Sequence, residues 1–292
     1  MNRYDNIGWI CRYLLDENPR YRQMAVPDSL EDRQQLMRSL LNIRPPMPVT
    51  EEFLQAQDTE LQAQLSDKGI MEILRFAQND KEIAQNAFCH PEEGVARRRI
   101  CEWQGDITRL KVDAIVNAAN SQMLGCFIPM HRCIDNAIHS AAGVQLRLAC
   151  EEILRFAQND REDAQNDRGG YYEEPTGSAR ITPGFNLPAK YVLHTVGPIV
   201  TTARPLKQQE VQLSSCYRSC LEMADKNGLQ SIAFCCISTG EFRYPNDLAC
   251  EIAVRTVREY LASHPETNLM NIVFNTFKDI DHELYQNALA KG

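Results

Sequence analysis

The fold of this chain can be read outward from the stretch Val112-Asp113-Ala114-Ile115-Val116-Asn117-Ala118-Ala119-Asn120-Ser121. A short apolar run that ends in small and polar residues is typical of a buried strand followed by a tight turn. From Ile100 onward, similar short runs alternate with longer amphipathic stretches. Strands that alternate with helices indicate an α/β fold, in which a largely buried sheet is covered on both faces.

The same patterns predict where the elements lie. Strands are expected over residues 99–103, 114–117, 179–182, 191–195, 231–237 and 271–274, and helices over residues 133–150, 208–227, 246–263 and 280–290. Before them, residues 5–68 are predicted to form three helices. Ser29 is expected to cap the second, and Thr50 to open the third, which ends near Gly69.

Length and composition bound the class of protein. The 292 residues could hold two average domains, or one large domain with an appendage. No apolar run approaches the roughly 20 residues that span a bilayer, and the chain starts without a signal-peptide pattern, so we expect a cytoplasmic protein that does not engage a membrane. Eleven cysteines without a framework spacing fit a reducing compartment. A net charge of −8 argues against a nucleic-acid partner but is compatible with a pocket for a small phosphorylated ligand.

One sequence occurs twice in the chain. Residues 72–86 and residues 152–166 are identical at thirteen of fifteen positions. Solenoid repeats come in arrays of at least three structural units, so two near-verbatim copies indicate a duplicated or inserted element. We interpret both copies as exposed insertions, either loops or short helices, and a paired docking motif is the alternative.

Three ligands for a soft or borderline metal lie together in the eight residues Cys126-Phe127-Ile128-Pro129-Met130-His131-Arg132-Cys133. Thiolate and imidazole together suit Zn²⁺, and three protein ligands leave a fourth position for water or substrate, as in catalytic sites. The spacing matches no zinc finger, which would need a fourth protein ligand. From the spacing alone, a loop that merely packs these side chains is the alternative. The other cysteines in apolar or helical settings are interpreted as core or surface thiols: Cys150, Cys216, Cys220, Cys235, Cys236 and Cys250.

Other segments carry polar groups that could serve a ligand. Asp106, after Gly105, could accept hydrogen bonds from an exocyclic amine, although an ordinary turn with a helix cap is the alternative. Asn120 presents an amide that both donates and accepts. Asp135 and His139 are four residues apart, so they are expected on one helical face, where a cap and a packed histidine are the alternative.

Two further segments lie downstream. The strand-to-helix turn Ser238-Thr239-Gly240-Glu241-Phe242 offers backbone N–H groups and a helix N-terminus to a pyrophosphate. His194 lies within a predicted strand, and we expect it to be a core residue or one that supports a neighbouring group instead of a catalyst.

Taken in order, five motifs resemble the macrodomain family: Gly105 to Thr108, Val112 to Ser121, Ile134 to Gly143, Tyr191 to Pro198 and Ile237 to Pro245. The resemblance covers residues 99–290. Most macrodomains have a glycine-rich stretch where this chain has Gly125 to Cys133. This replacement resembles the zinc-dependent subclass, which occurs in microbes and is often encoded beside a sirtuin-like ADP-ribosyltransferase. The segments Glu17 to Tyr21 and Arg44 to Pro48 resemble the helical extension of that subclass. The two copies of the duplicated sequence do not belong to the pattern.

The resemblance implies a three-layer α/β/α macrodomain with a central mixed sheet, preceded by an N-terminal helical extension. Residues 1–70 would form the extension, residues 71–98 a linker with the first inserted copy, and residues 99–292 the macrodomain, with an insertion near 151–170. In this family ADP-ribose binds in a cleft at the carboxyl ends of the strands, which follows the general rule for α/β sheets.

The resemblance also implies roles for single residues. Asp106 and the Ile107 backbone would contact the adenine, and the turn from Ser238 through Thr239, Gly240 and Glu241 to Phe242 would cradle the pyrophosphate. Asn120 would hold the distal ribose and also belongs to the catalytic set, and Asn117 would be one of the ligand-binding residues. Zn²⁺ on Cys126, His131 and Cys133 would lie beside that ribose, and Asp135 would accept or relay a proton.

The implied function is a hydrolase that removes mono-ADP-ribose from modified protein side chains. The resemblance points to acidic acceptors on a lipoyl-carrier-type protein. Two alternatives stay open: a reader that binds ADP-ribosylated proteins without cleaving them, and a deacetylase of acetylated free ADP-ribose. A pure reader needs no metal with an open position, whereas the deacetylase would share the hydrolase pocket.

Overall fold

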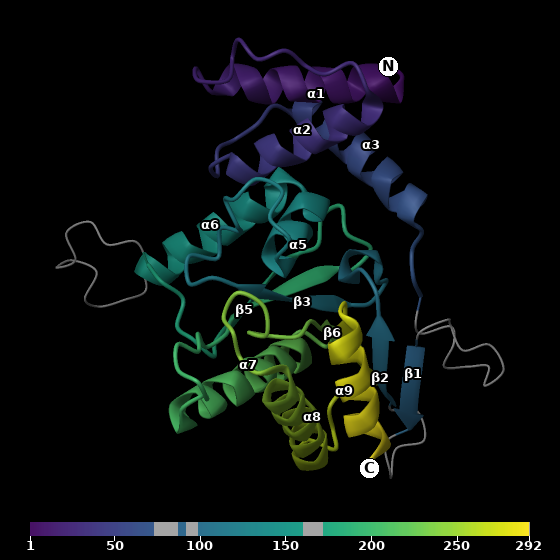
Figure 1. Ribbon diagram of the computed structural model, residues 1–292, viewed down its shortest axis with the longest axis vertical. Coiled ribbons are helices and arrows are strands. Elements are labelled where there is room, and N and C mark those ends of the chain that lie inside the picture. The colour runs from purple at the N-terminus through teal and green to yellow at the C-terminus, as the bar shows by residue number, and fades with distance from the viewer. Residues whose placement is uncertain (73–86, 92–98, 160–171, 292) are drawn as a thin grey trace. The chain divides into compact units, whose positions relative to one another are not determined.

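The computed structural model describes residues 1–72, 87–91, 99–159 and 172–291. The chain forms two compact units (Figure 1). The first comprises Met1–Gly69, Met123–Tyr172 and Phe185–Leu187, and the second comprises Ile70–Gln122, Glu173–Gly184 and Pro188–Gly292. The loop with the candidate metal ligands belongs to the first unit, and the sheet belongs to the second.

The described part of the first unit is helical: α1 (Arg3–Glu17), α2 (Leu30–Ile43), α3 (Glu51–Lys68), α5 (Ile134–Ala142) and α6 (Val144–Asn159). The first three helices begin at Asn2, Ser29 and Thr50, whose side chains each accept a hydrogen bond from a backbone N–H of the first turn. The predicted caps at Ser29 and Thr50 and the predicted end at Gly69 are confirmed.

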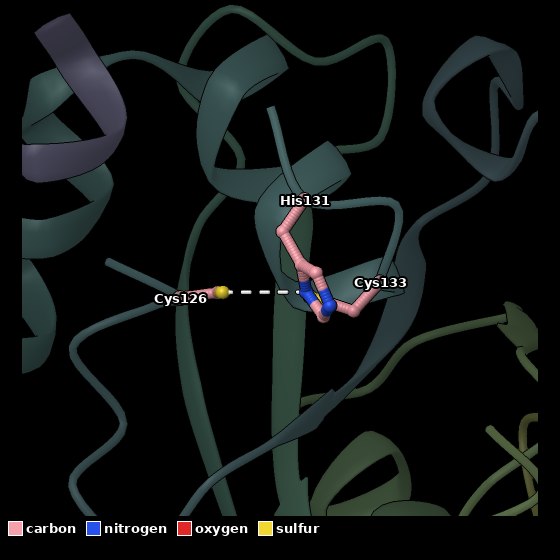
Figure 2. Close-up of side chains that lie close together, drawn as sticks. All are labelled: Cys126, His131 and Cys133. Atoms are coloured by element: carbon pink, nitrogen blue, oxygen red, sulfur yellow. Dashed lines mark hydrogen bonds between the residues drawn. The ribbon is translucent and has the colours of Figure 1, made fainter. Parts of the chain in front are cut away.

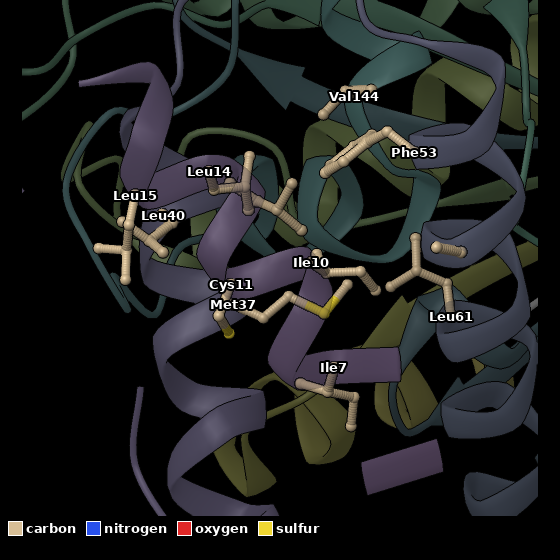
Figure 3. Close-up of a cluster of buried hydrophobic side chains, with 12 residues drawn as sticks. Ile7, Ile10, Cys11, Leu14, Leu15, Met37, Leu40, Phe53, Leu61 and Val144 are labelled. Carbon is tan, nitrogen blue, oxygen red and sulfur yellow. The ribbon is translucent and has the colours of Figure 1, made fainter. Parts of the chain in front are cut away.

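The N-terminal helices share one hydrophobic core (Figure 3). Ile7 and Ile10, three residues apart on α1, pack with Met37 of α2 and Phe53 of α3. Val144, the first residue of α6, joins the same cluster. Burying one such side chain contributes about 1.5–3 kcal/mol. Apolar burial therefore holds these helices together within the first unit.

The helix predicted over residues 133–150 is in fact two helices, because Gly143 interrupts it. Gly143 has a φ of +91°, in the left-handed region that favours glycine. A Cβ atom at this position would also lie 2.6 Å from Gln57 Nε2. The backbone N–H of Val144, which opens α6, donates to Gln57 Oε1 at 2.9 Å. The break thus separates α5, which follows the candidate metal loop, from α6.

Helix α6 continues into the second copy of the duplicated sequence. Residues 152–159 form its last turns, in which Leu154 is buried whereas Phe156 is 61% exposed. The interpretation of this copy as an exposed insertion therefore does not hold at Leu154, which packs as part of an amphipathic helix. The rest of this copy and most of the first copy lie outside the described residues.

The second unit is built on a seven-stranded mixed sheet in the order β1-β2-β7-β6-β3-β5-β4. Its strands are β1 (Ala87–Pro91), β2 (Arg99–Gln104), β3 (Ala114–Ala119), β4 (Ala179–Pro183), β5 (Tyr191–Val196), β6 (Ser231–Phe234) and β7 (Asn271–Thr276). The inner strands run parallel, and the edge strands β1 and β4 pair antiparallel with their neighbours. All the predicted strands are confirmed, although β6 ends at Phe234 and not at residue 237. The sequence patterns did not predict β1.

Three α-helices accompany the sheet in the described part of this unit: α7 (Lys207–Lys226), α8 (Asn246–Ser263) and α9 (Asp279–Ala290). Helix α7 contacts β4 and β5, α9 contacts β2 and β7, and α8 packs against both helices. All three match their predicted ranges within one residue at each end. None of the described helices is long and apolar enough to cross a membrane.

Candidate functional site

Polar residues follow the carboxyl ends of the parallel strands in the second unit. Asp106 comes after β2, Asn120 after β3, and Ser238 shortly after β6. Because β2, β7, β6 and β3 are parallel neighbours, their carboxyl ends lie along one edge of the sheet. Ligands of α/β proteins bind at this edge. The sheet topology therefore brings the predicted ligand-binding residues of this unit to the same side.

Asp106 is half-buried and caps the short 3-10 helix η1 (Ile107–Arg109). Its Oδ1 accepts hydrogen bonds from the Thr108 N–H at 3.0 Å and from the Thr108 hydroxyl at 2.6 Å. The helix-cap alternative is thus confirmed as one role of this carboxylate. A carboxylate offers about four lone-pair sites, so the cap leaves capacity for the predicted adenine contact. Ile107, directly after it, is buried.

Asn117 and His194 pair on the neighbouring strands β3 and β5. Asn117 Nδ2 lies 3.2 Å from His194 Nδ1, and the Thr182 hydroxyl lies 2.9 Å from His194 Nε2. Burial lowers the pKa of His194 to about 3, so the ring is neutral near pH 7. The prediction of a core histidine is confirmed. Asn117 is fully buried beside it, whereas Asn120 is half-buried at the end of the strand.

The turn from Ser238 to Phe242 combines a left-handed backbone with donors that lack partners. Ser238 has a φ of +66°, and its buried hydroxyl has no hydrogen-bond partner among the described residues. Within the same residues, the N–H groups of Gly240 and Phe242 take part in no backbone hydrogen bond. Thr239 is half-buried and Glu241 is exposed. A buried polar group without a partner costs about 1–3 kcal/mol, and an anion bound here would satisfy these donors.

In the first unit, the loop before α5 brings the three predicted metal ligands together (Figure 2). Cys126 Sγ and His131 Nδ1 are 3.5 Å apart. The ligand atoms of Cys126, His131 and Cys133 all lie within 4.8 Å of one another. Zinc bonds of about 2.3 Å to sulfur and about 2.0–2.1 Å to nitrogen, at a tetrahedral angle, separate the two donors by about 3.6 Å. The donor set and its spacing therefore fit a zinc ion.

The backbone of this loop is shaped by two left-handed positions. Gly125 has a φ of +82°, and a Cβ atom on it would lie 2.9 Å from the His139 ring. Met130 has a φ of +55°, which is strained for a residue with a side chain. The N–H of His131 donates to the Ile128 carbonyl at 3.2 Å and closes the turn. This tight turn brings His131 back toward Cys126.

Cys133 has a structural role as well as a place in the ligand set. It is the N-cap of α5, and its Sγ accepts a hydrogen bond from the Asn136 N–H at 3.4 Å. Burial raises the pKa of the Cys133 thiol to about 12, although the hydrogen bond from the Asn136 N–H acts in the opposite direction. In the metal-free protein Cys133 is therefore a neutral thiol at physiological pH.

Asp135 lies in the first turn of α5 and is only 5% exposed. Its Oδ1 is 3.5 Å from His139 Nε2, one helical turn later. The predicted placement of this pair on one face is confirmed. Asp135 is therefore a buried carboxylate that begins α5 directly after the candidate metal ligands and faces His139.

The loop also has contacts that sequence patterns did not predict. Asn136 Nδ2 donates to the Ile128 carbonyl at 3.1 Å. Arg147 Nε donates to the Leu124 carbonyl at 2.6 Å, and its guanidinium lies 4.4 Å from the centre of the Phe127 ring. Polar side chains inside helices form no motif, so no sequence signal could have identified these two.

The predicted core and surface thiols are confirmed. Five of them are buried and Cys236 is half-buried, and all carry free thiols: Cys150, Cys216, Cys220, Cys235, Cys236 and Cys250.

Comparisons with known proteins agree on one family. A family model described as "Macro domain" matches residues 116–253. A "Protein-ADP-ribose hydrolase" of Treponema medium is 45% identical over 282 residues, which cover 97% of each chain. A "Probable bifunctional ADP-ribose hydrolase/ADP-ribosyltransferase" of Fusarium oxysporum f. sp. cubense is 39% identical over 284 residues, which cover 94% of this chain and 44% of that one. Among solved structures, the Trypanosoma brucei macrodomain in complex with ADP-ribose matches with a TM-score of 0.55 and 36% identity, covering 68% of this chain and 72% of that chain.

Proposed function

This chain belongs to the macrodomain family, and on that premise we propose that it is a zinc-assisted hydrolase that releases mono-ADP-ribose from modified protein side chains. The main observation behind this proposal is that the side chains of Cys126, His131 and Cys133 lie close together directly before α5, the helix that contains Asp135. The name of the Treponema medium relative supports the reaction, because the similarity extends over nearly the whole of both chains.

The nucleotide part of the ligand is assigned to the second unit. Asp106 and the Ile107 backbone contact the adenine, and the turn from Ser238 to Phe242 receives the pyrophosphate. The buried Ser238 hydroxyl supports this assignment, because it has no partner among the described residues and a phosphate oxygen would supply one. Asn120, with the buried Asn117 behind it, contacts the distal ribose.

The chemical step is assigned to the first unit. Cys126, His131 and Cys133 hold a zinc ion, which when bound would supply a Lewis acid that polarises and orients a sugar hydroxyl or a water. Asp135 is the proposed base: its carboxylate accepts the proton from the attacking hydroxyl or water. The first turn of α5 holds this carboxylate in a fixed position. Asn120 is proposed to hold the distal ribose through its amide, which both donates and accepts hydrogen bonds.

The substrate and its origin are part of the same proposal. Acidic side chains are the proposed acceptors, and a lipoyl-carrier-type protein is the proposed partner, both on the resemblance to the zinc-dependent subclass. A functional link to a sirtuin-like ADP-ribosyltransferase is supported by the Fusarium oxysporum relative, whose name joins an ADP-ribose hydrolase and an ADP-ribosyltransferase. A transferase of this kind would generate the substrate.

Metal content and turnover test the proposal together. Protein purified without a chelator should carry about one equivalent of Zn²⁺ per chain by elemental analysis. The same protein should release ADP-ribose from a mono-ADP-ribosylated protein substrate. Tight ADP-ribose binding without release from any modified protein would favour a reader, and release of acetate from acetylated ADP-ribose alone would favour the deacetylase. A metal content near zero would remove zinc from the proposal.

Asp106→Asn should weaken ADP-ribose binding while turnover at saturating substrate stays close to wild type. Asparagine keeps the oxygen that caps η1, but it loses the charge that strengthens a hydrogen bond to adenine. Hydrogen bonds to charged groups contribute about 1.5–3 kcal/mol, which corresponds to roughly 10- to 150-fold in affinity. Calorimetric titration with ADP-ribose measures the effect, with Asp247→Asn on the exposed start of α8 as the control. Equal affinities for the two variants would contradict the adenine assignment.

A further inference from the structure

Two buried asparagines hold the tight turn of the candidate metal loop. The N–H of Met130 donates to Asn42 Oδ1 at 3.0 Å. At the other end of the turn, the Ile128 carbonyl accepts a hydrogen bond from Asn136 Nδ2 at 3.1 Å. His131 follows Met130 directly. The backbone on both sides of the turn is therefore fixed by side chains that are not themselves in the ligand set.

Both asparagines are tied to α2 of the N-terminal helices. Asn42 is itself near the end of α2. Arg38, one helical turn earlier, donates through Nη2 to Asn136 Oδ1 at 3.0 Å. Asn42 Nδ2 donates to the Ser140 hydroxyl on α5 at 2.9 Å. One face of α2 thus bridges the loop and the helix that follows it, all within the first unit.

Burial and strain make the Asn42 contact consequential. Asn42 is 1% exposed and Asn136 is fully buried, whereas Ile128 and Met130 of the loop are exposed, so each hydrogen bond ties an exposed loop residue to a buried side chain. The left-handed backbone of Met130, with a φ of +55°, is unfavourable for a residue with a side chain and persists only where its surroundings hold it. Without the Asn42 oxygen, the Met130 N–H loses its acceptor and the left-handed turn loses a hydrogen bond that holds it. The turn would then relax, and His131 would move with it.

We propose that Asn42 is a positioning residue of the candidate metal loop, through which helix α2 holds Met130 in the conformation that presents His131 beside Cys126. The metal-affinity part of this inference rests on the proposed function. Residues that do not bind the metal but hydrogen-bond to its ligands and orient them affect metal affinity strongly. Their replacement typically lowers metal affinity by roughly 10- to 100-fold. Helix α2 then contributes directly to the geometry of the candidate metal site, because it supplies the side chain that fixes the Met130 backbone.

The test compares Asn42→Ala with Asn6→Ala. Asn6 is also buried in the N-terminal helices, and its Nδ2 donates to the Ala56 carbonyl at 2.9 Å, but among the described residues it forms no hydrogen bond with the loop. Zinc affinity is measured by chelator competition. Asn42→Ala should bind zinc roughly 10- to 100-fold more weakly than wild type. Asn6→Ala should lose stability but keep wild-type zinc affinity. Asn42→Asp keeps the acceptor oxygen and should recover most of the affinity.

A second readout works on the metal-free protein. Amide hydrogen exchange at Met130 and His131 should be roughly threefold to tenfold faster in Asn42→Ala than in Asn6→Ala, because the lost hydrogen bond contributes about 0.5–1.5 kcal/mol. Asn42→Asp should exchange at the wild-type rate. If Asn42→Ala does not fold, Asn42→Leu, which fills a similar volume but lacks the acceptor oxygen for the Met130 N–H, should show the same two effects.

The outcomes separate this inference from the proposed function. If the wild type binds zinc, equal zinc affinities for Asn42→Ala and Asn6→Ala overturn the positioning role, whatever the exchange rates. If the wild type binds no zinc, the metal part of the proposed function fails, and exchange alone decides: faster exchange confined to the loop of Asn42→Ala supports the positioning role. Equal exchange in the two variants would then overturn it.

Discussion

Asp135→Asn should slow the release of ADP-ribose from a modified protein by roughly 10²–10⁴-fold, the usual contribution of a general acid or base. Asparagine matches the size of the buried carboxylate but cannot take up a proton. The proton moves only as the bond breaks, so the loss falls on the transition state and not on the bound substrate. ADP-ribose affinity should therefore change far less than turnover. Asp135→Ala should show the same separation.

Single-turnover kinetics measure the chemical step for this prediction, and calorimetry measures ADP-ribose affinity. Asp32→Asn is a matched control, because Asp32 also lies in the first turn of a helix in the first unit but is exposed. The control should keep wild-type turnover. Full activity in Asp135→Asn would show that another group takes the proton. An equal loss in turnover and affinity would instead assign Asp135 to ligand binding.

The order and extent of the elements were predictable because their signals are local. Ser29, Thr50 and Gly69 stand at helix ends in the sequence as they do in the structure. The apolar strands are short and bounded by turn residues, and their ends in the structure differ from the predicted ends by only a few residues. The clustering of the three candidate metal ligands was predictable for the same reason, since Cys126 and Cys133 are close in sequence. A tight turn then suffices to bring His131 to them.

What the sequence did not predict depends on contacts between distant segments. The break at Gly143 follows from a left-handed backbone packed against Gln57 of α3, whereas helical periodicity runs through residues 133–150 without interruption. Strand β1 at the sheet edge has only β2 as its neighbour, so its sequence carries no strong pattern. Asn42 contacts a loop 88 residues away in sequence, and no spacing rule links the two.

Histidine is the most informative of the three proposed metal ligands to remove. Cys133 also caps α5 through the Asn136 N–H, so its replacement would disturb a helix as well as a ligand. His131 is half-buried, and its Nδ1 lies 3.5 Å from Cys126 Sγ. His131→Ala should leave two protein ligands, too few for a stable zinc site. Zinc content should fall from about one equivalent to near none, and release of ADP-ribose should be lost with it.

Stability offers an independent readout of the same variant. A ligand present at 100 times its dissociation constant stabilises the folded state by about 2.7 kcal/mol, so a chelator should lower the melting temperature of the wild type. His131→Ala should show no response to the chelator, while His264→Ala, which removes a histidine at the end of α8, should respond as the wild type does. If His131→Ala loses zinc but keeps hydrolysis, the metal orders the loop and the polar groups of the chain carry the reaction. Loss of zinc and of hydrolysis together, with ADP-ribose binding retained, would show that the bound metal takes part in the cleavage step.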